Sequence, residues 1–306
     1  MVSIDTSLDT TRQTAGRRST LVSVAVNVAL ATLQMIVGVY AHSQALVADA
    51  IHSLSDLVSD GVVLFANKHS QKAPDAEHPY GHRRFETAAS LTLGALLLAV
   101  GIGMLWTAFN KLQDPSNIPR VHSIALAVAA IALVSKELLF HYMLRVAQRV
   151  RSSMLVANAW HARSDAASSL VVAIGIIANL AGFPLADPLA ALIVGLMVAR
   201  MGWKFFFRAF NDLMDQAVDL QTEGRIRTLL ASTPGVQGIH SLKTRKMGDM
   251  IWVEVDLEMD ATLTIAQGHA IADEARKRVM DHEPVLDVTT HFDPVRVARV
   301  DISANT

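Results

Sequence analysis

Two histidine–carboxylate pairs with identical spacing occur far apart in this sequence. His52 is followed four residues later by Asp56, and His161 is followed four residues later by Asp165. On a helix, residues four apart lie on one face about one turn apart, so each pair presents two metal-ligand side chains in the same direction. If the two faces meet, two imidazole nitrogens and two carboxylate oxygens complete a tetrahedral shell for a divalent ion such as zinc. The alternative is that each pair is a buried hydrogen-bonded contact that only holds helices together.

The composition indicates a membrane protein. Of 306 residues, 51% are hydrophobic and only 18% are charged, whereas a soluble domain carries about 25% charged residues. The net charge of -1, without a compact basic cluster, gives no reason to expect nucleic acid as a partner. Twelve histidines and no cysteine mean that transition metals must be bound by nitrogen and oxygen, and they exclude thiol redox chemistry. The first 16 residues are polar, so we expect no cleavable signal peptide.

The apolar residues fall into six stretches that we predict to be transmembrane helices. They lie near residues 19–41, 44–67, 88–110, 121–144, 153–181 and 186–207. Each is about the 20 residues that a helix needs to cross the hydrocarbon core. Lysine and arginine concentrate in alternate connections, so the positive-inside rule predicts that both termini are cytoplasmic.

This topology places the two pairs at the same depth. The first pair is centred about 14 residues before Lys68, or about 21 Å at roughly 1.5 Å per residue. The second pair is centred about 12 residues after Arg151, or about 18 Å from the same side. Both helices therefore present their pairs near the middle of the bilayer, where each ionisable group costs about 2.5–3.5 kcal/mol. A structural role alone does not require the same spacing twice at one depth, so we favour the metal site.

From about Asn211 the composition becomes that of a soluble domain. Helical spacing at 220–232 and 264–280, with strands at 236–246, 251–260 and 288–292, predicts an α+β domain of the ferredoxin-like type. We divide the chain into an N-terminal cytoplasmic tail (1–16), a six-helix transmembrane domain (17–210), a cytoplasmic ferredoxin-like domain (211–296) and a terminal tail (297–306). The predicted fold class is an α-helical polytopic membrane protein with this C-terminal cytoplasmic domain.

Two further groups of acids and histidines are candidate metal ligands. The loop after the second helix contains Asp75, His78 and His82; a solvated charged loop is the alternative, but beside the buried quartet a second metal site is the better interpretation. The C-terminal domain contains five more, each of which alone is typical of a surface residue: His240, Asp256, His269, His291 and Asp293. As a set they are a hypothesis for a third site.

Other polar and small residues lie within the predicted helices. Asp49 and Asp60 extend the polar stripe of the second helix; they either line the path of the ion or face aqueous vestibules. We expect Lys136 to form an interhelical pair, for example with Asp60. The glycines of the third helix, Gly94, Gly101 and Gly103, are predicted to be positions of close helix packing.

These features resemble the cation diffusion facilitator family. The resemblance runs from about residue 17 to 296 and rests on the segments Ala48–Asp56 and Asn158–Asp165, the His-Pro-Tyr-Gly-His loop and the ferredoxin-like tail. It implies a homodimeric exporter that exchanges a cytoplasmic divalent cation for protons, with a tail that dimerises and responds to metal. It also implies that Arg84 and Asp215 form a charge pair at the dimer junction. Members regarded as zinc-selective carry histidine at the position of His52.

We therefore predict efflux of Zn²⁺ in exchange for protons, across the inner (cytoplasmic) membrane. Cobalt or cadmium would suit the same ligands, and iron(II) or manganese transport is the alternative within the family. An intramembrane zinc hydrolase needs an open coordination position and a glutamate base, usually in His-Glu-x-x-His. That string is absent, so we expect no catalytic residue and no catalytic cofactor; zinc is the cargo and a structural or regulatory ligand. A metal sensor that transports nothing is the remaining alternative.

Overall fold

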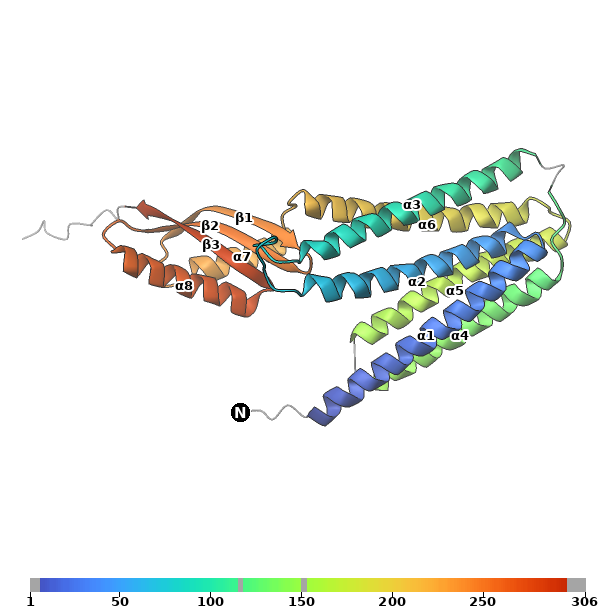
Figure 1. The fold of residues 1–306 in the computed structure, drawn as a ribbon, viewed down its shortest axis with the longest axis horizontal. Coiled ribbons are helices and arrows are strands. Elements are labelled where there is room, and N and C mark those ends of the chain that lie inside the picture. The colour runs from blue at the N-terminus through green and yellow to red at the C-terminus, as the bar shows by residue number, and fades with distance from the viewer. Residues whose placement is uncertain (1–5, 115–117, 150–152, 296–306) are drawn as a thin grey trace, which may run out of the picture. The chain divides into compact units, whose positions relative to one another are not determined.

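The computed structural model contains six long helices followed by a small α/β domain (Figure 1). It describes residues 6–114, 118–149 and 153–295; the side chains of residues 6–18, 63, 67, 153–155, 157, 158 and 161 lie outside that description. The chain forms two compact units. One contains the residues up to Val62 together with Thr92–Phe206, and the other contains Val63–Leu91 together with the residues from Phe207 onward. Three of the long helices therefore contribute residues to both units.

The six long helices include five that are apolar enough to cross a membrane. Their bounds are α1 Thr6–Tyr40, α2 Gln44–Ser70, α3 Arg84–Gln113, α4 Ile124–Arg149, α5 Ser153–Leu180 and α6 Ala186–Leu213. By length and composition α1, α3, α4, α5 and α6 qualify as spans. The polar stripe through Asp49, Asp56 and Asp60 lowers the hydropathy of α2, whose 27 residues are long enough to cross. The predicted helical membrane domain is confirmed.

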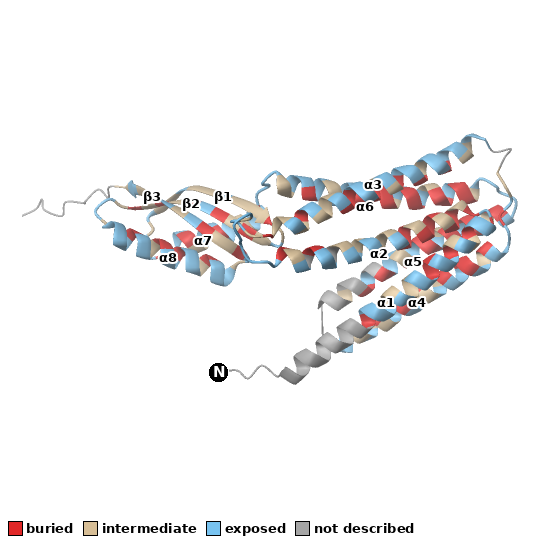
Figure 2. Cartoon of the chain, in the orientation of Figure 1, coloured by how far each residue is buried: buried red, intermediate tan, exposed pale blue. Residues whose placement is uncertain are grey.

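Large apolar side chains remain exposed on these helices, as the pale blue residues of Figure 2 illustrate. Ile36 on α1, Trp106 on α3, Leu138 on α4 and Leu196 on α6 are each more than half exposed. Such surfaces are unfavourable in water but match the hydrocarbon tails of a bilayer.

Small residues allow the helices of the first unit to approach closely. A Cβ at Gly101 of α3 would lie 2.5 Å from the backbone nitrogen of Ala199 on α6, and one at Gly94 would lie 2.3 Å from that of Phe206. Both are therefore close-packing positions, as predicted. The prediction for Gly103 is wrong, because a Cβ there would meet nothing within 4 Å. Two residues beyond Gly101, it lies on nearly the opposite face of the helix.

A carboxylate of α6 fixes the start of α2. Asp187 is buried and accepts hydrogen bonds from Ser43 Oγ at 2.5 Å, from the backbone N–H of Gln44 at 2.7 Å and from that of Ala45 at 3.3 Å. These backbone N–H groups belong to the first turn of a helix, which has no carbonyl partners of its own. Asp187 therefore caps α2 and fixes its beginning on α6.

The C-terminal domain consists of α7 Leu220–Ala231, β1 Gly238–Met247, β2 Met250–Asp260, α8 Ile265–His282 and β3 Val285–Val295. The sheet order is β1-β2-β3, with β1 antiparallel and β3 parallel to β2. Both helices lie on the same face of the sheet (Figure 1). The hairpin turns at Gly248, whose φ of 63° favours glycine. The predicted ferredoxin-like domain is confirmed in a three-stranded form, in which β2 and β3 pair directly.

A separate hydrophobic core holds this domain together. In β2 Ile251, Val253, Val255 and Leu257 are buried and alternate with residues that are more exposed, as in a strand with one face on the core. Residues of α7 and α8 complete the core, among them Ile226, Leu230, Ala275 and Val279.

Close packing between α3 and α6 predicts opposite effects for two glycine substitutions on one helix. Gly101→Ala is expected to destabilise the protein by about 1–3 kcal/mol, because the added methyl overlaps the α6 backbone. Gly103→Ala, the matched control, is expected to be neutral or slightly stabilising, since alanine is the better helix former. Thermal unfolding of the detergent-solubilised variants gives the unfolding midpoint of each. Equal midpoints for the two variants would contradict this packing.

Candidate metal centres

The structure brings together three of the four residues predicted to bind metal within the membrane. The ligand atoms of His52, Asp56 and Asp165 all lie within 4.8 Å of one another, and His52 Nδ1 is 3.6 Å from Asp56 Oδ2. Ligands of one tetrahedral zinc ion lie about 3.3 Å apart, given metal–ligand distances near 2 Å. Small side-chain movements would therefore bring these three atoms into one coordination shell.

The fourth predicted ligand lies outside the described side chains. His161 is on α5, one turn before Asp165, but its side chain is among those that the structure does not describe. Its participation stays a prediction, based on its spacing from Asp165.

Electrostatics favour a cation over a purely structural contact at this site. Asp56 and Asp165 come from different helices, and their carboxylates approach each other with little exposure to solvent. Two carboxylates in such a position repel each other, and a divalent cation between them relieves the repulsion. A hydrogen-bonded His–Asp pair alone would not need Asp165. The arrangement is therefore suited to binding a divalent cation with nitrogen and oxygen ligands.

The structure corrects the predicted partner of Lys136. Its Nζ lies 3.4 Å from Asp49 Oδ2, and both side chains are almost completely buried. Asp49 therefore lines no open path in this structure, whereas Asp60, the partner suggested by the sequence, is exposed. Asp60 follows Asp49 by three helical turns, so the two carboxylates lie at very different heights along α2.

The loop between α2 and α3 forms a second group of candidate ligands. Asp75 lies between two histidines, with Oδ1 3.4 Å from His78 Nδ1 and Oδ2 3.3 Å from His82 Nε2. The backbone N–H of His78 donates a hydrogen bond to Asp75 and lowers the pKa of that carboxyl, more than desolvation raises it. Asp75 is thus held as a carboxylate, the form that binds metal. All three ligand atoms lie within 4.8 Å of one another.

The five candidates of the C-terminal domain are only partly assembled. Asp293 lies between two histidines, 2.6 Å from His240 Nδ1 and 3.7 Å from His291 Nε2. Asp256 is the neighbour of His291 in the β2–β3 register. His269, by contrast, pairs with Asp273 on its own helix at 3.3 Å. Among the described residues this domain contains no three ligand atoms as close as those of the other two centres.

The charge pair expected between Arg84 and Asp215 is present within one chain. Arg84 at the start of α3 donates to Asp215, which follows α6. Arg245 of β1 also lies 3.8 Å from Asp215 and packs over the ring of Trp252. Sequence reasoning did not identify Arg245.

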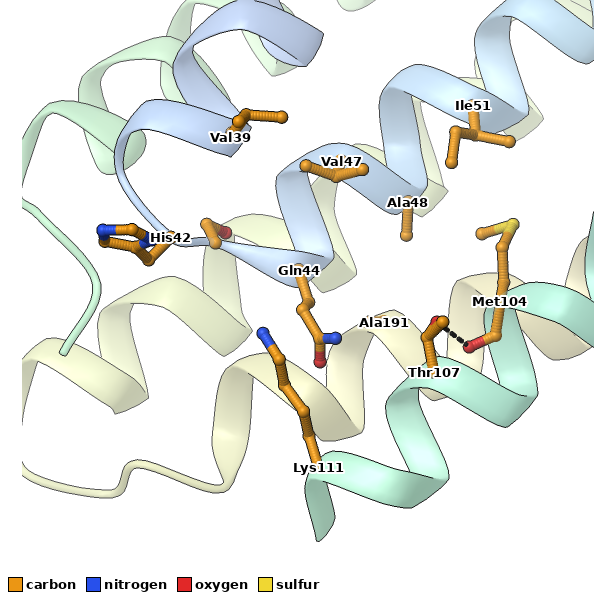
Figure 3. Close-up of a pocket in the computed structure, with 12 residues that line it drawn as sticks. Val39, His42, Gln44, Val47, Ala48, Ile51, Met104, Thr107, Lys111 and Ala191 are labelled. Carbon is orange, nitrogen blue, oxygen red and sulfur yellow. Dashed lines mark hydrogen bonds between the residues drawn. The ribbon is translucent and has the colours of Figure 1, made fainter. Parts of the chain in front are cut away.

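A small cavity opens beside the first turns of α2 (Figure 3). Its volume is about 200 Å³ and it is lined by residues near the α1–α2 turn, by α3 and by Ala191 of α6. Gln44 and Lys111 extend into the same part of it (Figure 3). Its lining reaches Ile51, the residue that precedes His52. The cavity thus lies beside the first two turns of α2.

Two family models together match nearly the whole chain. The model described as the cation efflux transmembrane domain matches residues 20–214. The model described as the cation efflux protein, cytoplasmic domain, matches residues 218–295. The first match includes α2 and α5 with their candidate ligands, and the second includes the C-terminal α/β domain.

Curated relatives match over most of this chain. Metal tolerance protein C1 of Arabidopsis thaliana is 34% identical over 88% of this chain, which spans only 60% of that protein. The manganese efflux system protein MneS of Bacillus subtilis is 32% identical over 92% of this chain and 96% of its own length. Among solved structures, a MamM C-terminal domain is 22% identical, covers 25% of this chain and 94% of the solved chain, and superposes with a TM-score of 0.25.

The contact between His240 and Asp293 predicts a pH-dependent stability of the C-terminal domain. The hydrogen bond from His240 to the Asp293 carboxylate, together with the attraction between them, raises the pKa of the imidazole. Stabilisation from a raised pKa is complete below the unfolded value of about 6.5 and is lost as the pH rises through the folded value. Proton NMR titration of a fragment of residues 211–306, which includes the whole hydrophobic core of this domain, measures the pKa of His240. We expect Asp293→Asn to return the pKa of His240 towards 6.5; an unchanged titration would show that this pair is not formed.

Proposed function

Because the chain belongs to the cation diffusion facilitator family of divalent-cation efflux transporters, we propose that it exports Zn²⁺ in exchange for protons. The observation that supports this most directly is the convergence of His52, Asp56 and Asp165 from two helices of the membrane domain. With His161 as the fourth ligand, the shell has two nitrogens and two oxygens. That number and those types of ligand are typical of tetrahedral zinc.

Manganese is the main alternative cargo. The relative from Bacillus subtilis is named a manganese efflux protein, and manganese prefers oxygen-rich shells of higher coordination number. A site with histidine on both helices favours zinc instead, followed by cobalt and cadmium, with iron(II) also compatible. The choice of cargo thus depends on whether both imidazoles bind the ion.

Proton exchange follows from the chemistry of the proposed ligands. Imidazole binds a metal only when it is neutral, and its unperturbed pKa is about 6.5. Metal and protons therefore compete for His52 and His161. Uptake on the cytoplasmic side releases protons, and protonation on the outer side helps expel the ion.

We further propose a homodimer in the inner membrane with both termini in the cytoplasm. Lys68, Lys72, Arg83 and Arg84 flank the loop between α2 and α3, which the positive-inside rule assigns to the cytoplasm. The C-terminal domain would lie on that side and join two copies, with the loop centre and the Asp293 cluster as sites where metal regulates or stabilises the dimer. The catalytic alternative is disfavoured, because with His161 as the fourth ligand the shell would leave no open position for water, and no glutamate is among the described ligands.

Metal-by-metal flux in reconstituted vesicles tests the cargo. We expect zinc to be transported with the lowest KM, and Asp165→Ala to abolish its transport because the cation loses a carboxylate ligand. Glu137→Ala is the matched control, since Glu137 also pairs with a histidine four residues away, His141, but on the exposed face of α4. Intact zinc flux in Asp165→Ala would overturn the site. If the intact protein transports manganese better than zinc, and Asp165→Ala abolishes that transport, only the choice of metal is overturned.

An imposed pH gradient tests the exchange. Zinc uptake into vesicles with an acidic interior is expected to exceed uptake without a gradient, because protons inside compete with zinc for the imidazoles and leave as zinc enters. A trapped pH-sensitive dye should report alkalinisation of the interior that depends on added zinc. The same measurement on Asp165→Ala corrects for proton leak. Zinc flux that is indifferent to the gradient, without alkalinisation, would contradict proton exchange.

A further inference from the structure

The ion pair between Asp49 and Lys136 lies beside the candidate transport site but contributes no ligand to it. Lys136 Nζ lies 3.4 Å from Asp49 Oδ2, and the side chains of Asp49 and Lys136 are 0% and 3% exposed. Ionisable residues within a membrane domain are costly, and their presence usually marks a function.

This pair connects four helices. The Asp49 carboxylate accepts hydrogen bonds from Gln34 Nε2 of α1 at 2.5 Å, from Ser168 Oγ of α5 at 2.9 Å and from Ser169 Oγ of α5 at 2.6 Å. Lys136 of α4 donates to Ser169 Oγ at 2.8 Å and to Ser53 Oγ of α2 at 3.2 Å. The buried charges are thus surrounded by hydrogen-bond partners, which is the condition for retaining them inside a protein.

The same contacts reach the backbone of the candidate ligands. Ser53 directly follows His52, and Ser168 lies three residues after Asp165. Ser168 Oγ is 2.7 Å from the carbonyl oxygen of Asp165, and Lys136 Nζ is 3.5 Å from that oxygen. Because a helix is stiff over one turn, the distance between Asp49 and Ser168 sets the distance between His52 and Asp165.

Stability alone does not explain why these two residues are charged. Apolar side chains of similar volume hold helices together as well as a buried ion pair, or better. Unlike an apolar contact, the pair and its hydrogen bonds are directional. They therefore fix both the spacing and the rotation of the helices that they join.

We propose that Asp49 and Lys136 are positioning residues for transport: they hold Asp165 of α5 against His52 and Asp56 of α2 at the separation that a small tetrahedral cation requires. The inference rests on the proposed function. It assigns part of the selectivity for zinc over the larger manganese ion to residues that touch neither metal. Loss of the pair would leave every ligand in place but loosen the shell.

The test compares Asp49→Asn, Lys136→Met and the double variant with the intact protein, using monodisperse full-length protein in detergent. Zinc and manganese affinities are measured by calorimetry in a background of Asp75→Ala and Asp293→Ala, which removes a ligand from each of the other two candidate centres. Thermal unfolding is measured on the same samples. We expect each single variant to weaken zinc binding about 10–100-fold, as substitutions that disturb the orientation of metal ligands do. Manganese binding should change less, so the preference for zinc should fall.

The double variant separates positioning from folding. It leaves no unpaired charge, so we expect its thermal stability to recover towards that of the intact protein while its zinc affinity stays low. Lys136→Arg, which keeps the charge, should retain more of the zinc preference than Lys136→Met. Asp187→Asn is the matched control for a buried carboxyl, since the hydrogen bonds of Asp187 go to the first turn of α2, about two turns before His52. The zinc affinity of Asp187→Asn should be unchanged.

Two results would overturn the proposal. The first is a zinc affinity of the double variant that lies within twofold of that of the intact protein. The second is a loss of zinc affinity in Asp187→Asn that equals the loss in Asp49→Asn. Asp165→Ala distinguishes failure of this inference from failure of the proposed function. If zinc binding is lost in Asp165→Ala but kept in the double variant, only the positioning role fails. If it is kept in Asp165→Ala, the transport site itself is wrong.

Discussion

A polar group inside a bilayer must find its partners within the protein, and α2 is the helix on which this constraint acts most strongly. Its stripe of Asp49, His52, Asp56 and Asp60 keeps it from being apolar enough to cross on composition alone. The most deeply buried carboxylate of α2 is tolerated in a membrane because α1, α4 and α5 supply hydrogen-bond donors and a cation to Asp49. The arrangement of these helices around α2 thus follows from the need to satisfy its charges.

Carboxylates in the described part of the membrane domain find partners in three different ways. Asp187 caps a helix terminus and Asp49 pairs with Lys136, so each has hydrogen-bond donors that match it. Asp56 and Asp165 instead face each other across two helices. Their mutual repulsion is unfavourable unless something positive comes between them. Asp187 and Asp49 thus keep permanent partners inside the protein, whereas the proposed role of Asp56 and Asp165 is to hold a cation that comes and goes.

Much of the fold could be predicted from the sequence because it depends on local spacing. The period of apolar residues gave the long helices and the strands, and i, i+4 spacing gave the faces that carry His52 and Asp56. Contacts between helices were harder, because they depend on the rotation of each helix about its axis. Lys136 was therefore assigned to Asp60 when its partner is Asp49, and Gly103 was grouped with Gly101 although it lies on another face. Ser168 and Ser169 carried no signal, since serine is common in membrane helices.

The proposed site draws its ligands from two different helices, which suits a carrier. Three ligand atoms from α2 and α5 lie within 4.8 Å of one another, so small side-chain movements would close the shell around a zinc ion. A rigid, preformed shell would bind more tightly and release the ion more slowly. On the proposed mechanism the empty site is also unfavourable, because its carboxylates repel each other unless protons replace the metal. Electrostatics would then make return of the carrier depend on protons, and the exchange would need no separate coupling device.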